Sequence, residues 1–309
     1  MFIVDGHCDT LHALLIKEED LSDNSLQVSK NALDICSKEG ILQFFAVFES
    51  PSNPIEKQKA DVRTMIDSYH KISEENYMKK VLSKKDLQGE GIKALLSLEG
   101  LYFMEGDIGL LDNLYDDGVR CMSLTWNPDN EFAGGVSGVS GGGLTEKGFE
   151  LIKKAFGKGI LIDVSHITDK GFWDIAEAAG INRKPFVATH SNARKLCSHK
   201  RNLDDRMLKE LARAGGVTGI NMFSCFLSDK CEADINDVIR HIEYICSLIG
   251  PSYVGFGSDF DGIDRAKSAI AGPSKIGGVL ERLLKLNYSE KDVIKIASGN
   301  FLRVLKEVL

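Results

Sequence analysis

The sequence lacks the features that mark several large classes of protein. No run of apolar residues approaches the roughly 20 needed for a membrane-spanning helix. Asp5 and His7 interrupt the N-terminus before an apolar segment long enough for a secretory signal has formed. Lysine and arginine form no basic patch, and the net charge of −7 argues against nucleic acid or anionic membrane as the main partner. We therefore expect a cytoplasmic protein with no nucleic-acid or membrane partner.

Reactive motifs built on cysteine or serine are also missing. The seven cysteines are odd in number, scattered along the chain and form no Cys-x-x-Cys pair. We expect them to be reduced thiols, as is usual in the cytoplasm. No serine lies in a Gly-x-Ser-x-Gly elbow, the motif that would indicate a nucleophile of the α/β-hydrolase type.

What the chain does have is a regular alternation of short apolar segments and helical patterns. Eight segments have the length and composition of strands: 2–4, 41–48, 92–98, 119–125, 159–166, 186–190, 216–221 and 253–257. No repeat, linker or break in composition divides the 309 residues. This pattern predicts one domain over 1–309 with a single (β/α)₈ barrel of the TIM type. A doubly wound open sheet is the alternative, but no Gly-x-Gly-x-x-Gly follows the first strand.

The segments between the strands read as helices with one exception. Short helices are expected within 11–38, and a long helical pattern runs from Pro54 to about Leu87. Later helices are expected over 108–115, 145–158, 168–179, 204–214, 234–248, 276–286, 289–297 and 299–308. The exception is the glycine-rich stretch 126–143, which has the length of a functional lid. A disordered connector is the alternative for that stretch.

Histidines and carboxylates recur where the predicted strands end. In chain order they are His7, Asp9, Glu99, His166, His190 and Asp259. In a barrel of parallel strands the carboxyl ends meet at one face, where such enzymes place their active sites. We therefore expect these side chains to converge, although they are far apart in the sequence.

Each of these residues also has an ordinary structural interpretation. His166 could be satisfied by its neighbour Ser165, and His190 could cap the following turn. Glu99 could be a loop carboxylate, and Asp259 or Asp261 could be a turn former. Their joint recurrence at strand ends favours a site over these separate explanations. The other histidines, at positions 12, 70, 199 and 241, lack this placement, and we expect them to be surface or core residues.

Three histidines with several carboxylates and no cysteine suit a hydrolytic site with two zinc ions. Glu99 is the natural bridge, because its two oxygens can each bind one ion. His7 and Asp9 would complete the coordination of one ion, and His166 and His190 would complete the coordination of the other. A water held between the ions would lose a proton near neutral pH and act as the nucleophile, while the ions polarise the scissile carbonyl.

The chain resembles the membrane dipeptidase (renal dipeptidase) family, a branch of the amidohydrolase-like metallopeptidases, over essentially its full length. The matching blocks are Asp5-Gly-His-Cys-Asp9, Leu98-Glu-Gly100, Asp163-Val-Ser-His166, Thr189-His-Ser-Asn-Ala-Arg194, Arg201-Asn-Leu-Asp-Asp205, Gly257-Ser-Asp-Phe-Asp-Gly262 and Gly299-Asn-Phe-Leu-Arg303.

The resemblance implies a zinc-dependent enzyme that cleaves dipeptides, including those with a C-terminal D-residue. It matches His7, Asp9, Glu99, His166 and His190 to the zinc ligands of the family, with Glu99 bridging. It further implies that Arg201 binds the carboxylate of the substrate, which suits a guanidinium fork. Asp259 matches the acid that holds the substrate amine and moves a proton to the leaving group. We also expect a homodimer or a higher homo-oligomer.

One block departs from the family. Many relatives carry Leu-Thr-His-Asn after the fourth strand, with a histidine that helps to bind substrate and stabilise the oxyanion, whereas this chain has Leu124-Thr-Trp-Asn127. An indole donates one hydrogen bond but carries no charge near pH 7. We expect Trp126 and Asn127 to contact the substrate and to change which substrate is used. The alternatives to a dipeptidase are a two-metal hydrolase of another small amide and a catalytically silent metal-binding barrel.

Overall fold

In the computed structural model, eight parallel strands close into a barrel, as the sequence predicts. The structure describes residues 1–17, 20–22, 24–74 and 77–309. The barrel strands are β1 (Ile3–Cys8), β2 (Ile41–Phe48), β4 (Ile92–Glu99), β5 (Val119–Ser123), β6 (Leu161–Asp163), β7 (Val187–Ala188), β8 (Val217–Ile220) and β9 (Val254–Phe256). The ring closes because β1 pairs with β9 and β2 pairs with β4. This closure excludes the open doubly wound sheet.

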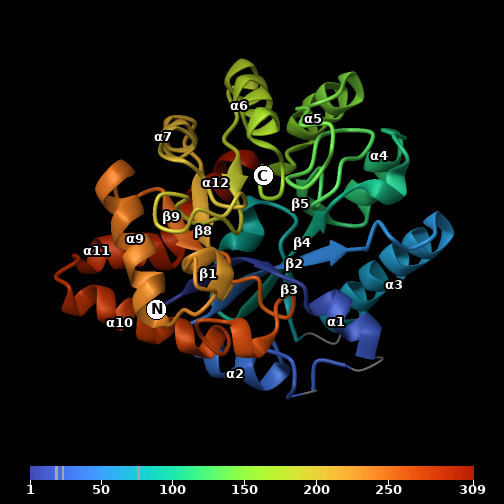
Figure 1. The fold of residues 1–309 in the computed structure, drawn as a ribbon. Helices are drawn as coiled ribbons and strands as arrows, with labels where there is room; N and C mark the ends of the chain where they lie inside the picture. The colour runs from blue at the N-terminus through green and yellow to red at the C-terminus, as the bar shows by residue number, and fades with distance from the viewer. Residues whose placement is uncertain (18–19, 23, 75–76) are drawn as a thin grey trace.

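Helices surround the barrel (Figure 1). They are α1 (Thr10–Lys17), α2 (Lys30–Ser37), α3 (Ile55–Glu74), α4 (Leu110–Asp116), α5 (Glu146–Lys158), α6 (Asp169–Asn182), α7 (Asp205–Arg213), α8 (Ser224–Leu227), α9 (Ile235–Ile249), α10 (Ile276–Lys285), α11 (Glu290–Ile294) and α12 (Asn300–Val308). Polar residues begin several of them: Thr145 and Thr168 accept hydrogen bonds from the backbone of the first turns of α5 and α6. Such caps satisfy N–H groups that the helix itself leaves unpaired.

One prediction about the helices is wrong. The helical pattern expected from Pro54 to about Leu87 ends with α3 at Glu74. Beyond it, the two-residue strand β3 (Lys79–Lys80) pairs in parallel with β4, outside the closed ring. A 3₁₀ turn, η1 (Lys84–Leu87), follows and is capped by Ser83 and Asp86. Edge pairing with β4 therefore overrides the helical propensity of this lysine-rich segment.

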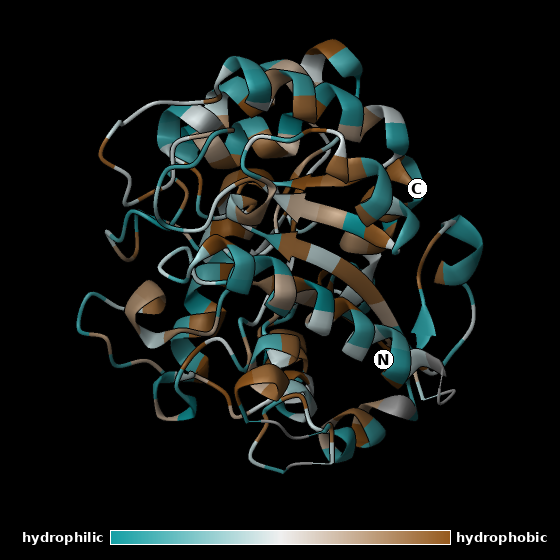
Figure 2. Cartoon of the chain, turned by 90° about the vertical axis from the view of Figure 1, so that its right-hand side faces the viewer, coloured by the Kyte–Doolittle hydropathy of each residue, from teal (hydrophilic) through white to brown (hydrophobic). Residues whose placement is uncertain are grey.

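Alternation along the strands separates two apolar regions. Side chains two residues apart share a face of a strand, so one face of each strand points outward to the helices and the other points into the barrel. The outward faces and the helices form the larger apolar cluster. Figure 2 shows the strands as largely hydrophobic, whereas the helices alternate between hydrophilic and hydrophobic residues.

The smaller apolar cluster fills the barrel near the amino ends of the strands. Its strand members include Val4, Leu42, Phe44, Leu95, Cys121, Leu161, Val187 and Val217. Helix α12 closes this end of the barrel, because Phe301, Val304, Leu305 and Val308 pack into the same cluster. The closing amphipathic helix expected over 299–308 is thus present, and its apolar face plugs the barrel. The short 3₁₀ turns η2 (Tyr102–Met104), η3 (Arg265–Lys267) and η4 (Pro273–Lys275) and the π-helical turn η5 (Lys295–Gly299) complete the secondary structure.

The expectation that all cysteines are reduced is wrong for one pair. Cys225 and Cys231 form a disulfide across the turn that follows α8. The fold brings these two positions together, with their Cα atoms 3.8 Å apart, although their spacing matches no familiar motif. The other five cysteines are free thiols. Among the described residues, no helix is both long enough and apolar enough to cross a membrane.

Candidate metal centre

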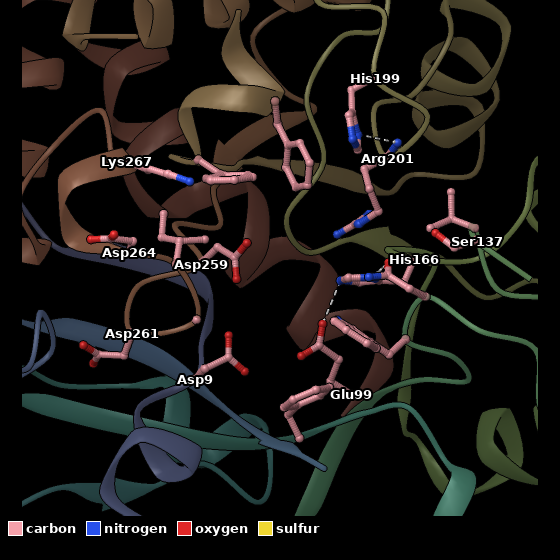
Figure 3. Close-up of a pocket in the computed structure, with 18 of the residues that line it drawn as sticks. Asp9, Glu99, Ser137, His166, His199, Arg201, Asp259, Asp261, Asp264 and Lys267 are labelled. Carbon is pink, nitrogen blue, oxygen red and sulfur yellow. Dashed lines mark hydrogen bonds and ion pairs between the residues drawn. The ribbon is translucent and has the colours of Figure 1, made fainter. Parts of the chain in front are cut away.

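A cavity of about 700 Å³ opens at the carboxyl ends of the strands. Asp9, Glu99, His166, Arg201 and Asp259 line it, as Figure 3 shows, and each comes from a different strand end or following loop. The opposite end of the barrel is the one that α12 closes. The predicted convergence of strand-end side chains is therefore observed at the face where barrel enzymes bind substrates.

Glu99 lies at the centre of this cluster and presents one oxygen to each side. Its Oε2 is 3.6 Å from His7 Nε2. Its Oε1 is 2.8 Å from His166 Nε2 and 3.6 Å from His190 Nε2. The two imidazole nitrogens of His166 and His190 are 3.0 Å apart. Glu99 is thus positioned to share its carboxylate between two groups of ligands.

On the side of Oε2, two further carboxylates approach His7. The distance from His7 Nε2 is 3.4 Å to Asp9 Oδ2 and 3.9 Å to Asp259 Oδ1. Two overlapping sets have ligand atoms close enough to hold an ion: His7 with Glu99 and His190, and His7 with Asp9 and Asp259. Because one imidazole nitrogen binds one ion, these sets are alternative choices of ligands around His7. In both sets His7 contributes a ligand atom.

The histidines on the other side are oriented by hydrogen bonds at their second nitrogen. His166 Nδ1 lies 2.9 Å from Asn127 Oδ1 and donates to it. Thr189 Oγ1 donates to Asp163 Oδ2, so it accepts from His190 Nδ1, 2.8 Å away. In both rings the proton is therefore on Nδ1, and the lone pair of Nε2 points at Glu99. This is the usual second-shell arrangement of metal-binding histidines.

Buried atoms without partners indicate what the cluster is suited to hold. His7 Nε2 and Asp9 Oδ1 are buried and have no hydrogen-bond partner among the described residues. Their residues are only 3% and 5% exposed, so bulk water does not satisfy them. Unpaired buried polar atoms are costly, and a divalent cation coordinated by imidazole and carboxylate would satisfy both. The donor set of nitrogen and oxygen fits zinc.

The electrostatics of the cluster agree with this fit. Burial alone would lower the pKa of His7, but the carboxylates of Glu99 and Asp9 raise it well above its usual value. Burial, followed by the charge of Glu99, raises the pKa of Asp9 to about 8. Burial and the positive charge of Arg201 lower the pKa of His166. Histidines, in contrast, hold the pKa of Glu99 well below its usual value against the effect of burial. The buried carboxyl of Asp9 thus retains a proton at neutral pH that a bound cation could replace.

Arg201 presents an unsatisfied guanidinium to the same cavity. The residue is 5% exposed. Within the part of the chain that the structure describes, its Nε and Nη2, which lie on one edge of the guanidinium, have no hydrogen-bond partner. The loop that carries it is held rigidly: Arg194 donates to both carboxylate oxygens of Asp169 and to the carbonyl oxygens of Lys200 and Asn202. A buried fork of this kind fits a carboxylate bidentately.

Two site residues have left-handed backbone conformations. His166 has a φ of 72° and Asp259 a φ of 66°, which are uncommon for residues with a side chain. Asn221 Nδ2 donates to Asp259 Oδ2 at 2.8 Å and fixes that carboxylate. Such conformations cost free energy and are concentrated at functional sites. Asp261 also has a positive φ, which agrees with a position in a turn. Its carboxylate, however, accepts hydrogen bonds from Thr10 and from the backbone N–H groups of Gln27 and Val28, which are far away in the sequence, so it ties separate segments together.

The glycine-rich stretch 126–143 is an ordered wall of the cavity, so the disordered-connector interpretation is wrong. Close packing explains the glycine at position 135, where a Cβ atom would lie 2.0 Å from the carbonyl oxygen of Pro128. Trp126, Asn127, Val136 and Ser137 face the cavity. The Trp126 ring packs against Phe48, with centroids 5.2 Å apart, and lies 6.2 Å from the His166 ring.

Two histidines lie in the cavity although the sequence predicts them to be surface or core residues. His12, on α1, and His199, two residues before Arg201, both line the cavity. We expected both to be surface or core residues because neither follows a predicted strand. For His199 the sequence did hold a signal, its position beside the block that contains Arg201. His241 is buried as expected, with Nδ1 accepting from Ala193 N–H and Nε2 donating to the carbonyl of Leu227.

Comparisons with known proteins agree with the geometry. The model of the membrane dipeptidase family (peptidase family M19) matches residues 1–309. A Klebsiella pneumoniae protein named as an uncharacterized protein in the pqqA 5′ region is 37% identical over 68% of this chain and 80% of its own length. Dipeptidase aclJ of Aspergillus oryzae is 32% identical over 70% of this chain, but the match spans only about half, 52%, of that protein.

The fold is shared with a solved metallopeptidase. The crystal structure of a Rhodobacter sphaeroides metallopeptidase, liganded with a phosphinate mimic of the dipeptide L-Ala-D-Ala, superposes with a TM-score of 0.88. The superposition covers 100% of this chain and 99% of that one at 22% sequence identity. At this identity the likeness establishes the barrel architecture alone.

Proposed function

We propose that this chain, which belongs to the membrane dipeptidase family and is therefore a hydrolase of the metallodipeptidase class, cleaves the peptide bond of dipeptides with two zinc ions. The observation that carries the proposal is the position of Glu99, whose two oxygens face separate groups of histidines and carboxylates in one cavity. We also propose that residues 1–309 act as one metallopeptidase domain. The cytoplasmic location and the homo-oligomeric state stay predictions from the sequence.

We infer how the ligands divide from the two oxygens of Glu99, because His7 lies near Oε2 whereas His166 and His190 lie near Oε1. His7 and Asp9 would hold one ion with Glu99, and His166 and His190 would hold the other. When bound, the ions would supply Lewis-acid polarisation of the scissile carbonyl and an activated water. Asn127 and Thr189 contribute by keeping the Nε2 lone pairs of His166 and His190 directed at the centre.

The other residues of the cavity would bind and orient the dipeptide. The unpaired Nε and Nη2 of Arg201 would accept the C-terminal carboxylate. Asp259, fixed by Asn221, would bind the N-terminal amine and pass a proton to the nitrogen of the leaving amine as the peptide bond breaks. A cation at one end and an anion at the other favour a substrate of two residues, because a longer chain would separate its termini beyond this span.

A second candidate is the hydrolysis of another small amide at the same centre. Trp126 is the observation that favours it, because its ring packs on Phe48 beside the metal ligands, where an indole cannot provide the charge of a histidine. Removing one oxyanion donor typically costs about a hundredfold or more in rate. The apolar ring would then favour a substrate whose cleavage depends less on that donor.

The test combines metal analysis with turnover. Protein purified without chelators would be analysed for zinc and assayed on matched L-L and L-D dipeptides, the latter because the Rhodobacter relative is liganded with an L-Ala-D-Ala mimic. We expect about two zinc ions per chain and hydrolysis of dipeptides that a chelator abolishes and zinc restores. Two zinc ions without dipeptide turnover would favour the second candidate, and a panel of other small amides would separate it from a silent barrel. Absence of tightly bound metal would contradict both.

The role of Arg201 has its own test. Arg201→Ala should raise KM about a hundredfold for dipeptides with a free carboxylate, since a bidentate charged contact is lost. The same dipeptides with an amidated C-terminus serve as the control and should be affected much less. Equal losses on both substrates would remove Arg201 from the role of carboxylate ligand.

A further inference from the structure

The cavity has a second wall, away from the metal centre, that the proposed reaction does not use. Three aromatic rings form it: Phe226 packs against His199 with centroids 4.5 Å apart and against Phe223 at 4.9 Å. The guanidinium of Arg201 lies 5.5 Å from the Phe226 centroid. The wall therefore begins at the residue that would bind the substrate carboxylate and continues outward from it.

A lysine flanks this wall on each side. Lys200 lies in the chain between His199 and Arg201. Lys267 precedes Ser268, which forms a backbone bridge with Phe223. Both lysines line the cavity, and among the described residues neither ammonium group has an ion pair or a hydrogen bond. Figure 3 shows Lys267 and Arg201 on the same cavity, with Asp259 below Lys267.

The acids that line the cavity are, in contrast, already engaged. Asp261 accepts three hydrogen bonds from Thr10 and the backbone of residues 27–28. Asp264 accepts from the backbone N–H of Ala266 within its own turn. Asp9, Glu99 and Asp259 belong to the metal centre. Hydrogen bonds from neutral donors leave the charges of Asp261 and Asp264 in place, but they fix where those carboxylates point. Lys200 and Lys267 are thus cavity cations without a partner among the described residues.

We propose that His199, Phe223 and Phe226, with Lys200 and Lys267, form a subsite for an anionic side chain on the C-terminal residue of the substrate. The preferred substrates are then dipeptides that end in aspartate or glutamate. This inference rests on the proposed function, because the anchoring of the C-terminal carboxylate at Arg201 is what directs the neighbouring side chain to this wall. The aromatic rings would pack on its methylene groups, and the two ammonium groups would attract its carboxylate.

The expected preference is moderate, because both lysines are exposed. An exposed ion pair contributes a few-fold at most, so two of them give a preference of about tenfold. The preference should weaken as salt is raised, since the Debye length falls from about 10 Å at 0.1 M to about 3 Å at 1 M. The matched neutral substrates are dipeptides ending in asparagine or glutamine, which have nearly the same shape and lack the charge.

The experiment measures kcat/KM of the zinc-loaded protein for alanyl-glutamate against alanyl-glutamine, and for alanyl-aspartate against alanyl-asparagine, with C-terminal residues of both configurations. We expect the acid to be preferred about tenfold in one configuration. The double variant Lys200→Met/Lys267→Met should bring this ratio close to one, whereas Lys200→Arg/Lys267→Arg should preserve it. Lys209→Met/Lys285→Met, which removes two exposed lysines outside the cavity, is the matched control and should keep the wild-type ratio.

The outcomes separate this inference from the function on which it rests. Hydrolysis with equal rates for acid and amide, or a preference that survives in the methionine double variant, overturns the anionic subsite and leaves the dipeptidase intact. If no dipeptide is hydrolysed, the proposed function fails, and calorimetric binding of the same pairs to the wild type and the double variant decides the subsite. Tighter binding of the acid that depends on the two lysines supports it, and equal binding overturns it.

Discussion

The two ends of the barrel treat buried charge in opposite ways, and strand β4 carries one example of each. Lys93, near its start, is 1% exposed, and its Nζ donates to the carbonyl oxygens of Leu87, Gln88 and Gly89 at 2.6–3.0 Å. Glu99, at its end, is also buried, at 5% exposed, but faces His7 Nε2, which has no hydrogen-bond partner among the described residues. The amino end satisfies its own charge, whereas the carboxyl end is arranged to be completed by a cation. Stability and function are therefore concentrated at different ends of one fold.

The strongest test of this division is Glu99→Ala. The variant should lose at least one zinc ion and reduce kcat by about four orders of magnitude, because both metal groups share this carboxylate and the metal supplies the activated water. Metal analysis and kinetics on dipeptides measure the two effects. Thermal unfolding of the metal-free protein is the control that separates loss of metal from loss of the fold. Burial alone would raise the pKa of Glu99, but His7 and His166 hold it well below its usual value, so the variant should also lose some stability. Full metal content with full rate would contradict the bridging role.

At the opposite end, Phe301→Ala should act on stability instead. The ring is buried in the apolar cluster that plugs the barrel, so its loss should lower the free energy of unfolding by about 3–5 kcal/mol. Denaturant unfolding of the metal-free protein measures this. The kcat/KM of the folded variant should stay near the wild-type value, and Val304→Ala, a smaller truncation in the same cluster, should show the same pattern more weakly. A large fall in kcat/KM in both variants would show that the two ends are coupled.

His241 differs from His7, because both ring nitrogens of neutral His241 have hydrogen-bond partners, Ala193 N–H and the carbonyl oxygen of Leu227. Burial lowers its pKa to about 4, below its usual value of 6.5. The unfolded chain therefore binds the proton more readily, and stability falls as the pH drops from 6.5 to 4, by up to about 3 kcal/mol at 1.36 kcal/mol per pH unit. Unfolding measured against pH should show this, and His241→Gln, which keeps an acceptor and a donor, should flatten the curve by that amount. Parallel curves for the two proteins would contradict it.

The smallest effect is expected at Asn127, which orients the proposed metal ligand His166 by a hydrogen bond but does not itself bind the metal. Asn127→Leu frees the Nδ1 proton of His166 and should weaken zinc binding by roughly 10- to 100-fold. Competition with a chelator measures the affinity independently of turnover. Asn127→Asp retains the accepting oxygen and should largely restore affinity. If the leucine variant bound zinc as tightly as the wild type, Asn127 would have to act through the substrate, as the sequence resemblance first led us to expect.

The sequence predicts the barrel and the positions of the central side chains, because both depend on strong local signals. Apolar runs of strand length are unambiguous, and a histidine or carboxylate directly after such a run has a defined place in a closed parallel sheet. The positions of Glu99, His166 and His190 are therefore predictable from the sequence. The same logic fails where a residue reaches the cavity from a helix or a loop, as His12 and His199 do.

Other features depend on contacts between segments that have no local signature. The lysines at 79 and 80 look helical, and only the presence of β4 beside them makes β3. The pairing of Cys225 with Cys231 requires the turn after α8 to bring the two thiols together. The hydrogen bond from His166 to Asn127 joins residues 39 positions apart. Tertiary context decides each of these, so single-sequence patterns do not contain them.

Helix α12 also sets the order in which the molecule can mature during synthesis. Every barrel strand precedes it in the chain. While the chain is still being synthesised, the inner apolar side chains near the amino ends of the strands, such as Val4 and Phe44, have no cover. The metal centre has a similar requirement, since its side chains extend from β1 to the residues after β9. A nascent chain therefore exposes an uncovered hydrophobic interior until residues near 308 have emerged, which defines the window in which chaperones would have to protect it.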